Sequence, residues 1–179
     1  MNQEYTITAF SENSIGLLTR ITIIFTRRHV NIESLTVSES SIKGIHKFTI
    51  VVNVNENMVK KITTQIEKLV EVLKAFYHTK EDIIFQEVAL YKVSTEALLS
   101  NNLFEKTVRK HNARILEVTT DFTVIEKTGH ESETQELFEE LKAIGLKQFT
   151  RSGRIAITKS NVEYLSEFLS KRESGKDDI

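Results

Sequence analysis

The chain has 179 residues, with 24 Lys and Arg against 25 Asp and Glu, and it contains neither cysteine nor proline. The missing cysteines exclude disulfides, cysteine zinc sites and a thiol nucleophile, and the net charge of −1 argues against nonspecific binding to nucleic acid. Average usage would give about 9 prolines, so the turns of this chain rest on Gly, Asn, Asp and Ser instead.

The first half of the chain predicts six elements in the order βαββαβ. Early residues alternate Thr and Ile as in a strand, and the next apolar residues have the spacing of one buried helical face. Ser14 is the predicted N-cap of that helix, and Gly16 allows the tight turn into it. The predicted strands are Tyr5–Phe10, Ile32–Val37, Phe48–Val54 and Val70–His78, and the predicted helices run from Leu17 to Phe25 and from Val59 to Leu69.

The second half repeats this order. A hairpin turns at Thr120-Asp121, and Gly145 ends the second helix as its C′ residue. A short helix at Val162–Leu169 precedes a polar tail at Lys171–Ile179, which we expect to be frayed. The predicted strands are Glu87–Val93, Arg114–Thr119, Phe122–Lys127 and Phe149–Thr158, and the predicted helices are Leu103–His111 and Glu133–Ile144.

The predicted fold class is α+β, with two ferredoxin-like βαββαβ units that meet near Lys80–Asp82. Each unit has an antiparallel four-stranded sheet with two helices on one face. The other face or the edge strands are left for a partner, and a unit of ~80 residues buries only a modest fraction of its surface. We therefore expect an oligomer, with sheets joined edge to edge between protomers.

The residues that usually carry enzyme chemistry form no local motif. The glycines are scattered singly, without a phosphate-binding loop, and there is no GxSxG elbow. Glutamates such as Glu136, Glu139 and Glu140 fit the polar face of a helix. No two histidines have metal-ligand spacing, although convergence in three dimensions stays open. The histidines are His29, His46, His78, His111 and His130. We predict no catalytic residue and no metal ligand.

The element order is also that of RNA-recognition modules, whose third strand carries aromatic residues that stack on bases. The segment Lys43-Gly44 matches the start of that motif, but Ile45, Lys47 and Ile50 fill the aromatic positions. We therefore expect no nucleic-acid partner. No apolar run reaches the ~18–20 residues of a membrane span, and no signal peptide is visible. We expect no membrane partner and a cytoplasmic location.

The turn Ser11–Leu18, between the first strand and the first helix, is the best candidate ligand site. Backbone N–H groups at a helix N-terminus bind anions, and the helix dipole favours negative charge there. A free amino acid has a carboxylate for such a site and an ammonium that needs acceptors. Asn13 and Asn31 offer amides near the two ends of this helix. The alternative is that both serve the turns, because Asn tolerates left-handed backbone and caps helices.

Read in full, these segments resemble the regulatory (small) subunit of acetolactate synthase, also called acetohydroxyacid synthase. Glu12–Arg20 is similar to the family's Asn-x-x-Gly-x-Leu-x-Arg, and the match continues over Phe25–Val37, in which Asn31–Val37 is the more specific block. The family usually has Gly in place of His29 and often Ser-Arg in place of His46-Lys47. Further matches are Gln65–Val72, Arg114–Val118, Thr128-Gly129 and Thr150–Gly153, so the resemblance covers residues 4–158.

The resemblance implies an N-terminal ACT domain at 1–80, a C-terminal ferredoxin-like domain at 83–170 and a tail at 171–179. The ACT domain is implied to pair in a homodimer and to bind a branched-chain amino acid, typically valine, at the interface. The expected effector-binding residues are Asn13, Ser14, Ile15, Gly16, Leu17 and Leu18 of one protomer, with Asn31 and Ile32 of its neighbour.

The resemblance also implies that this chain is not an enzyme by itself and carries no cofactor. A separate catalytic subunit would hold thiamine diphosphate, magnesium and FAD, and would join two 2-oxo acids with loss of carbon dioxide. This chain would activate that subunit and confer feedback inhibition in valine, leucine and isoleucine biosynthesis. One alternative is a stand-alone tandem ACT amino-acid sensor. Another, a small ferredoxin-like lyase or isomerase, lacks an acid–base constellation.

Overall fold

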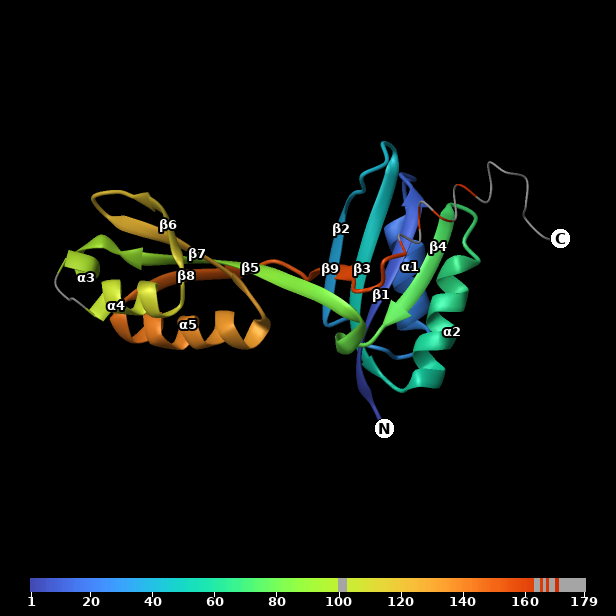
Figure 1. Ribbon diagram of the computed structural model, residues 1–179, viewed down its shortest axis with the longest axis horizontal. Helices are drawn as coiled ribbons and strands as arrows, with labels where there is room; N and C mark the ends of the chain where they lie inside the picture. The colour runs from blue at the N-terminus through green and yellow to red at the C-terminus, as the bar shows by residue number, and fades with distance from the viewer. Residues whose placement is uncertain (100–102, 163–164, 166, 168–169, 171–179) are drawn as a thin grey trace. The chain divides into compact units, whose positions relative to one another are not determined.

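The computed structural model describes residues 1–99, 103–162, 165, 167 and 170. Contacts between residues divide the chain into two compact units (Figure 1). Unit 1 contains Met1–Ile84 together with the segment that starts at Ala156, and unit 2 contains Phe85–Ile155. Among the described residues, no helix is long and apolar enough to cross a membrane.

Unit 1 is an antiparallel sheet with strand order β2-β3-β1-β4 and two helices. The central strand β1 pairs with β3 along its whole length, from Gln3 opposite Val54 to Glu12 opposite Ile45. The elements are β1 (Gln3–Glu12), α1 (Leu17–Thr26), β2 (Ser34–Glu39), β3 (Ile45–Val54), α2 (Glu56–Glu67), β4 (Val72–His78) and a 3-10 turn at Lys80–Asp82.

Side chains alternate along β1 and serve both faces of its sheet. Tyr5, Ile7 and Ala9 are buried in the core that α1 and α2 cover. Thr8 and Phe10 lie on the opposite face and are buried as well. A strand with one solvated face would leave these intervening positions exposed, so the second face of this sheet is also covered.

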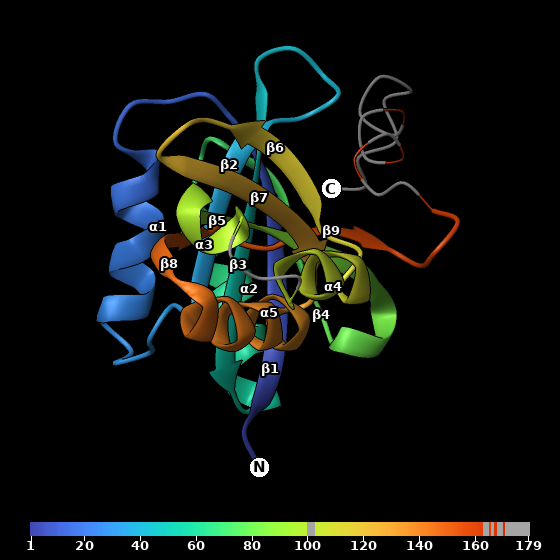
Figure 2. The same cartoon turned by 90° about the vertical axis from the view of Figure 1, so that its left-hand side faces the viewer.

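The cover of the second face comes from β9 and the residues that follow it up to Val162. Ala156 and the residues after it group with unit 1, and Figure 2 shows β9 (Ile155–Thr158) and α1 on opposite sides of this sheet. Lys47 Nζ, from β3, donates a hydrogen bond to the carbonyl of Ala156 at 2.5 Å. The face that we expected to be free for a partner is therefore largely buried within the chain.

Unit 2 has the second sheet, with strand order β6-β7-β5-β8, and β9 also pairs with β5. Its core joins the sheet residues Ala89, Tyr91 and Val93 to Phe104 and Leu137 from the helices. The elements are β5 (Ile83–Ser94), α3 (Thr95–Leu99), α4 (Leu103–Lys110), β6 (Arg114–Val118), β7 (Phe122–Gly129), α5 (Glu131–Ile144) and β8 (Leu146–Arg151).

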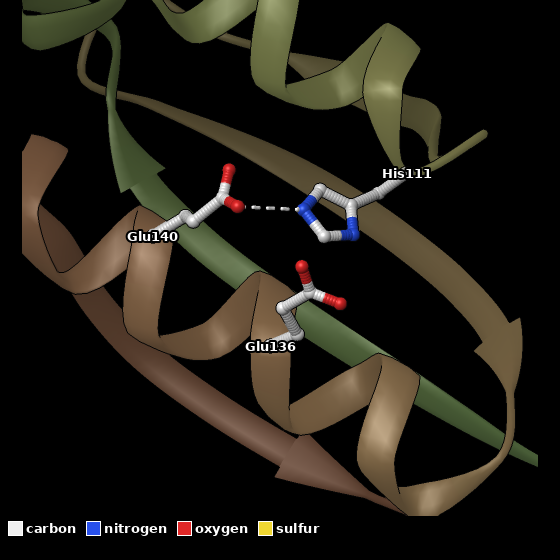
Figure 3. A group of neighbouring side chains, drawn as sticks. All are labelled: His111, Glu136 and Glu140. Atoms are coloured by element: carbon white, nitrogen blue, oxygen red, sulfur yellow. Dashed lines mark ion pairs between the residues drawn. The ribbon is translucent and has the colours of Figure 1, made fainter.

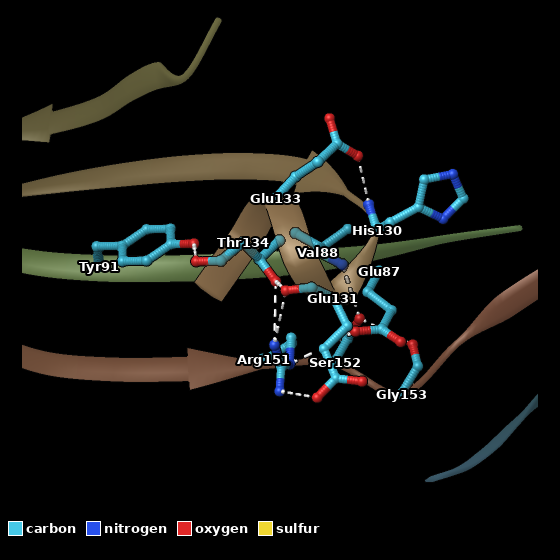
Figure 4. Close-up of polar contacts among 10 residues, drawn as sticks. All are labelled: Glu87, Val88, Tyr91, His130, Glu131, Glu133, Thr134, Arg151, Ser152 and Gly153. Carbon is cyan, nitrogen blue, oxygen red and sulfur yellow. Dashed lines mark hydrogen bonds and ion pairs between the residues drawn. The ribbon is translucent and has the colours of Figure 1, made fainter. Parts of the chain in front are cut away.

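The family-like segment Thr150–Gly153 joins the start of α5 to the sheet (Figure 4). The Arg151 guanidinium donates to the Glu131 carbonyl at 3.3 Å and to Thr134 Oγ1 at 3.1 Å. Its Nε lies 3.4 Å from a carboxylate oxygen of the buried Glu87. Ser152 pairs with β5, because its N–H donates to the Val88 carbonyl at 2.8 Å. Arg151 therefore links β5, β8 and α5 through one side chain.

The predicted α+β class with two βαββαβ units is confirmed, but the second sheet, predicted with four strands, has β9 as a fifth. The sequence missed α3, and the strand predicted at Phe149–Thr158 is two strands, β8 and β9, separated at Ser152–Arg154. The prediction failed there because β8 ends at Arg151 and the chain is not in a strand again until Ile155. The predicted helix Val162–Leu169 lies mostly, and the tail Lys171–Ile179 wholly, outside the described residues. The domain ranges 1–80, 83–170 and 171–179 stay predictions.

Tyr91 gives the stability of unit 2 a dependence on alkaline pH. Its buried hydroxyl donates to the Thr134 carbonyl at 2.6 Å, and burial raises its pKa to about 12. An unfolded tyrosine ionises near pH 10. Between about pH 10 and about pH 12 the unfolded chain loses a proton that the folded chain keeps, so the free energy of unfolding falls by ~1.4 kcal/mol per pH unit.

We expect Tyr91→Phe to lower the free energy of unfolding by about 1 kcal/mol at neutral pH, because it removes the hydrogen bond. The same variant should lose less stability than the parent as the pH rises above about 10. Urea unfolding of both proteins across this pH range measures the difference. Parallel pH profiles for parent and variant would contradict the assignment.

Candidate functional site

The turn from β1 into α1 is built around Gly16. Gly16 is the N-cap of α1 and has a left-handed backbone with φ of +81°. A Cβ at Gly16 would meet no atom within 4 Å, so the backbone conformation, and not space, favours glycine here. The prediction that Ser14 is the N-cap is wrong, because the left-handed Gly16 starts the helix two residues later. The Ser14 carbonyl instead accepts a hydrogen bond from the Leu17 N–H at 3.3 Å.

The first turn of α1 is open to an anion. No side chain among the described residues caps the helix, and its first turn contains no acidic residue. The first backbone N–H groups of a helix have no acceptor within the helix itself. The helix dipole adds roughly half a positive charge at this end. These features together make the turn suitable for a carboxylate.

The residues that directly precede β3 and β4 hold this turn in place. The Asn13 N–H donates to the Gly44 carbonyl at 3.2 Å, and the Glu12 N–H donates to the Glu71 carbonyl at 2.9 Å. The Glu71 carboxylate also pairs with the Arg20 guanidinium at 2.5 Å, which lowers the pKa of Glu71. Because Arg20 already has this partner, attraction for an added anion comes mainly from the N–H groups of the helix.

The predicted site residues at this turn differ in exposure. Asn13 and Gly16 are exposed, and Ser14 is half-buried. Ile15 is fully exposed at 103% and Leu18 is exposed at 46%. Leu17 is only 2% exposed, because its side chain belongs to the core of unit 1. Ile15 and Leu18 therefore present apolar side chains to the outside, whereas Leu17 offers only its backbone.

The other predicted site residues lie at the far end of α1. The helix ends in a Schellman motif, in which the His29 N–H donates to the Thr26 carbonyl and the Val30 N–H to the Phe25 carbonyl, both at 3.1 Å. Asn31 is exposed, and its Nδ2 donates to Glu33 Oε1 at 3.2 Å. Ile32 packs partly against the core.

The two groups of predicted site residues are not brought together within one chain. Helix α1 has 10 residues, which corresponds to a length of ~15 Å. An amino acid is too short to bridge that distance. A ligand held by Asn13–Leu18 can therefore meet Asn31 and Ile32 only if a second protomer supplies them.

Sequence reasoning missed three residues that shape this turn. Gly44 lies in the predicted break between two strands, and Arg20 ends the quoted family motif, so both had a signal in the sequence. Glu71 had none, because its pairing with Arg20 depends on the fold. The positive charge of Arg20, which lies next to this turn, is thus paired with Glu71, a residue 51 positions away in the chain.

A cavity of about 210 Å³ lies between the second face of the unit 1 sheet and the segment 156–162. Lys47 and His78 contribute polar groups to it, and burial is the main reason that the pKa of His78 is lowered. Phe10 and Phe76 form aromatic walls. The lining residues are Thr8, Phe10, Lys47, Phe76, His78, Ile83, Ala156, Ile157, Thr158, Ser160, Asn161 and Val162.

Two family models match this chain. Residues 7–74 match the model described as an AHAS small subunit-like ACT domain. Residues 86–160 match the model described as the small subunit of acetolactate synthase. The first match contains the whole α1 region described above, and the second contains the segment with Arg151.

Individual proteins give the same result. The chain is 35% identical to the acetolactate synthase small subunit of Bacillus subtilis over 161 residues, covering 89% of this chain and 93% of the relative. It is 32% identical to the probable small subunit of Archaeoglobus fulgidus, covering 88% of this chain and 98% of the relative. The crystal structure of the Thermotoga maritima small subunit superposes with a TM-score of 0.80 at 27% identity, covering 89% of this chain and 99% of that one.

His29 has a φ of +54°, a conformation that is unfavourable for a side chain with a Cβ. Unit 2 ends α4 with the same motif, in which Asn112 has a φ of +50° and its following N–H, from Ala113, donates to the Val108 carbonyl at 2.9 Å. We expect His29→Gly to raise the free energy of unfolding by up to about 1 kcal/mol. Asn112→Gly should raise it less, because Asn tolerates this conformation.

The matched control is His46→Gly, at a histidine in the regular strand β3. It should lower the free energy of unfolding by about 0.5–1 kcal/mol, since glycine loses more backbone entropy on folding. Urea unfolding of the parent and of the three variants measures these changes in the free energy of unfolding and ranks them. Equal destabilisation by His29→Gly and His46→Gly would show that no strain is stored at His29.

Proposed function

Because the chain belongs to the family of acetolactate synthase small subunits, we propose that it activates a separate catalytic subunit of that enzyme and makes it sensitive to a branched-chain amino acid. The observation that carries this proposal is the extent of the family match, which covers residues 7–74 and 86–160. A stand-alone amino-acid sensor would need only the first of these regions, so the second supports an enzyme partner.

The proposed effector is valine or a related amino acid, held between two protomers. Its carboxylate would accept hydrogen bonds from the uncapped first turn of α1, after Gly16. Its ammonium would bind the amide oxygens of Asn13 and of Asn31 from the neighbouring protomer. Its aliphatic side chain would contact Ile15 or Leu18, whose side chains are exposed in the single chain.

The same geometry supports a homodimer as part of this proposal. The two ends of α1 can meet one ligand only across two chains, because the helix, ~15 Å long, holds them apart. Ile23 on α1 and Val37 on the edge strand β2 are also exposed apolar residues, and a partner that covered them would remove apolar surface from water. These positions support pairing of unit 1 with a second copy through the α1 and β2 side.

A ligand at such an interface can regulate a distant partner. It shifts the equilibrium between two arrangements of the dimer only by its difference in affinity for them, commonly ~1–3 kcal/mol. The chemistry itself, in this proposal, stays with the catalytic subunit. That subunit would carry thiamine diphosphate, magnesium and FAD, and would join two 2-oxo acids with loss of carbon dioxide.

Reconstitution tests the activation step. We expect acetolactate formation by the catalytic subunit to rise several-fold when this chain is added, and to fall again as valine is titrated. The chain alone should form no acetolactate. A rate that this chain leaves unchanged, together with valine binding by the isolated chain, would favour the stand-alone sensor instead.

Calorimetry tests the effector site separately from activation. Asn31→Ala should weaken valine binding at least about tenfold, because a hydrogen bond to a charged group is worth ~1.5–3 kcal/mol. Asn53→Ala is the matched control, since Asn53 is exposed on β3, and it should bind valine like the parent. Equal affinity of Asn31→Ala and the parent would remove Asn31 from the site.

A further inference from the structure

Three side chains that are far apart in the sequence meet between α4 and α5 in unit 2 (Figure 3). Glu136 and Glu140 are four residues apart on α5 and so lie on one face of that helix. His111 directly follows α4 and points toward them. One potential ligand atom from each of the three residues lies within 4.8 Å of the other two.

The imidazole of His111 is buried without a hydrogen bond at the nitrogen that faces the carboxylates. The residue is 7% exposed, and among the described residues Nε2 has no hydrogen-bond partner. Nε2 lies 3.2 Å from Glu140 Oε1, but only a protonated imidazole would form an ion pair there. Buried polar atoms almost always have a partner. A buried nitrogen without one is therefore an exception, and it is available to a ligand.

The ammonium group of Lys110 forms ion pairs with both carboxylates. Its Nζ lies 2.5 Å from Glu140 Oε1 and 3.4 Å from Glu136 Oε1. The side chain of Lys110 is 58% exposed, and a long exposed lysine can turn into solvent at little cost. The pair of carboxylates thus already holds one positive charge that another cation can replace.

We propose that His111, Glu136 and Glu140 bind a divalent first-row transition metal ion such as Zn²⁺, in competition with Lys110. One imidazole nitrogen and two carboxylate oxygens are a ligand set that zinc accepts, with water in the fourth position. Calcium and magnesium prefer sites made of oxygen alone. Ligand atoms around tetrahedral zinc are about 3.4 Å apart, close to the separation of Nε2 and Glu140 Oε1.

The bound ion ties the end of α4 to the middle of α5. All three proposed ligands belong to unit 2, whereas the proposed amino-acid site belongs to unit 1. Metal binding does not depend on the catalytic subunit. Loss of effector binding would therefore leave metal binding intact, and loss of metal binding would leave the proposed regulatory function standing.

The test is a calorimetric titration of the full, metal-free chain with Zn²⁺ alone, repeated with Co²⁺, Mg²⁺ and Ca²⁺. We expect one Zn²⁺ per chain and at least tenfold weaker binding of Mg²⁺ and Ca²⁺. In an absorption spectrum of the same protein, bound Co²⁺ should give a visible band. Losing even a residue that only supports a ligand typically costs about 10–100-fold in affinity. Glu136→Gln should therefore weaken Zn²⁺ binding by at least tenfold.

Two further variants identify the site. Lys110→Ala removes the competing cation and should strengthen Zn²⁺ binding several-fold, whereas a site elsewhere would not respond. Glu139→Gln, an exposed neighbour on α5 outside the cluster, is the matched control and should bind like the parent. Both changes are at the surface, so the test does not rely on a substitution of the buried His111.

Either of two results would overturn the proposal. One is the absence of stoichiometric Zn²⁺ binding by the parent chain. The other is equal affinity of the Glu136→Gln and Glu139→Gln variants, which would place any bound zinc on other residues. Circular dichroism of each variant checks that the fold is retained.

Discussion

The double burial of β1 is the constraint on which unit 1 depends. Its odd-numbered apolar side chains pack under α1 and α2, and Thr8 and Phe10 are buried on the other face, where they line a cavity with residues of the segment 156–162. A strand that is buried on both faces has a fixed position and register, since a slip by one residue would exchange the two sets. The position of β1 in turn fixes where the loop after it begins, and so where the first turn of α1 lies. Gly16 then sets the direction of the helix, and with it the direction of its free N–H groups.

Local periodicity was enough to predict most of the fold. The spacing of Leu17, Ile21 and Phe25 predicted α1, and the alternation from Phe48 to Val54 predicted β3, because both patterns report which side faces the core. The N-cap was predicted at Ser14 because serine is a common N-cap residue. The helix instead starts at Gly16, because the chain turns there with a left-handed backbone that glycine adopts readily. The cover over the second sheet face depends on contacts between β9 and strands that come far earlier in the chain. No local pattern near Ala156 reports such contacts.

The candidate sites show the same division. Asn13 and Asn31 were found from the helix they flank and from the family resemblance, but only the length of α1 shows that one chain holds them apart. The cluster at His111 had no sequence signal, because its histidine and its two glutamates come from different elements. Pairing of α4 with α5 creates it. The ion pair of Arg20 with Glu71 is a similar case, since it joins the start of α1 to the turn before β4.

The return of the segment 156–162 to unit 1 also bears on how the protein can be divided experimentally. A fragment that stops near Lys80–Asp82 keeps every strand of the first sheet but loses the segment that lies over Thr8, Phe10 and Phe76. Such a fragment would expose an apolar strip to water and would tend to self-associate. Its oligomeric state would then reflect the cut and not the native pairing. A fragment that is meant to keep both faces of this sheet covered has to include the segment 156–162 as well.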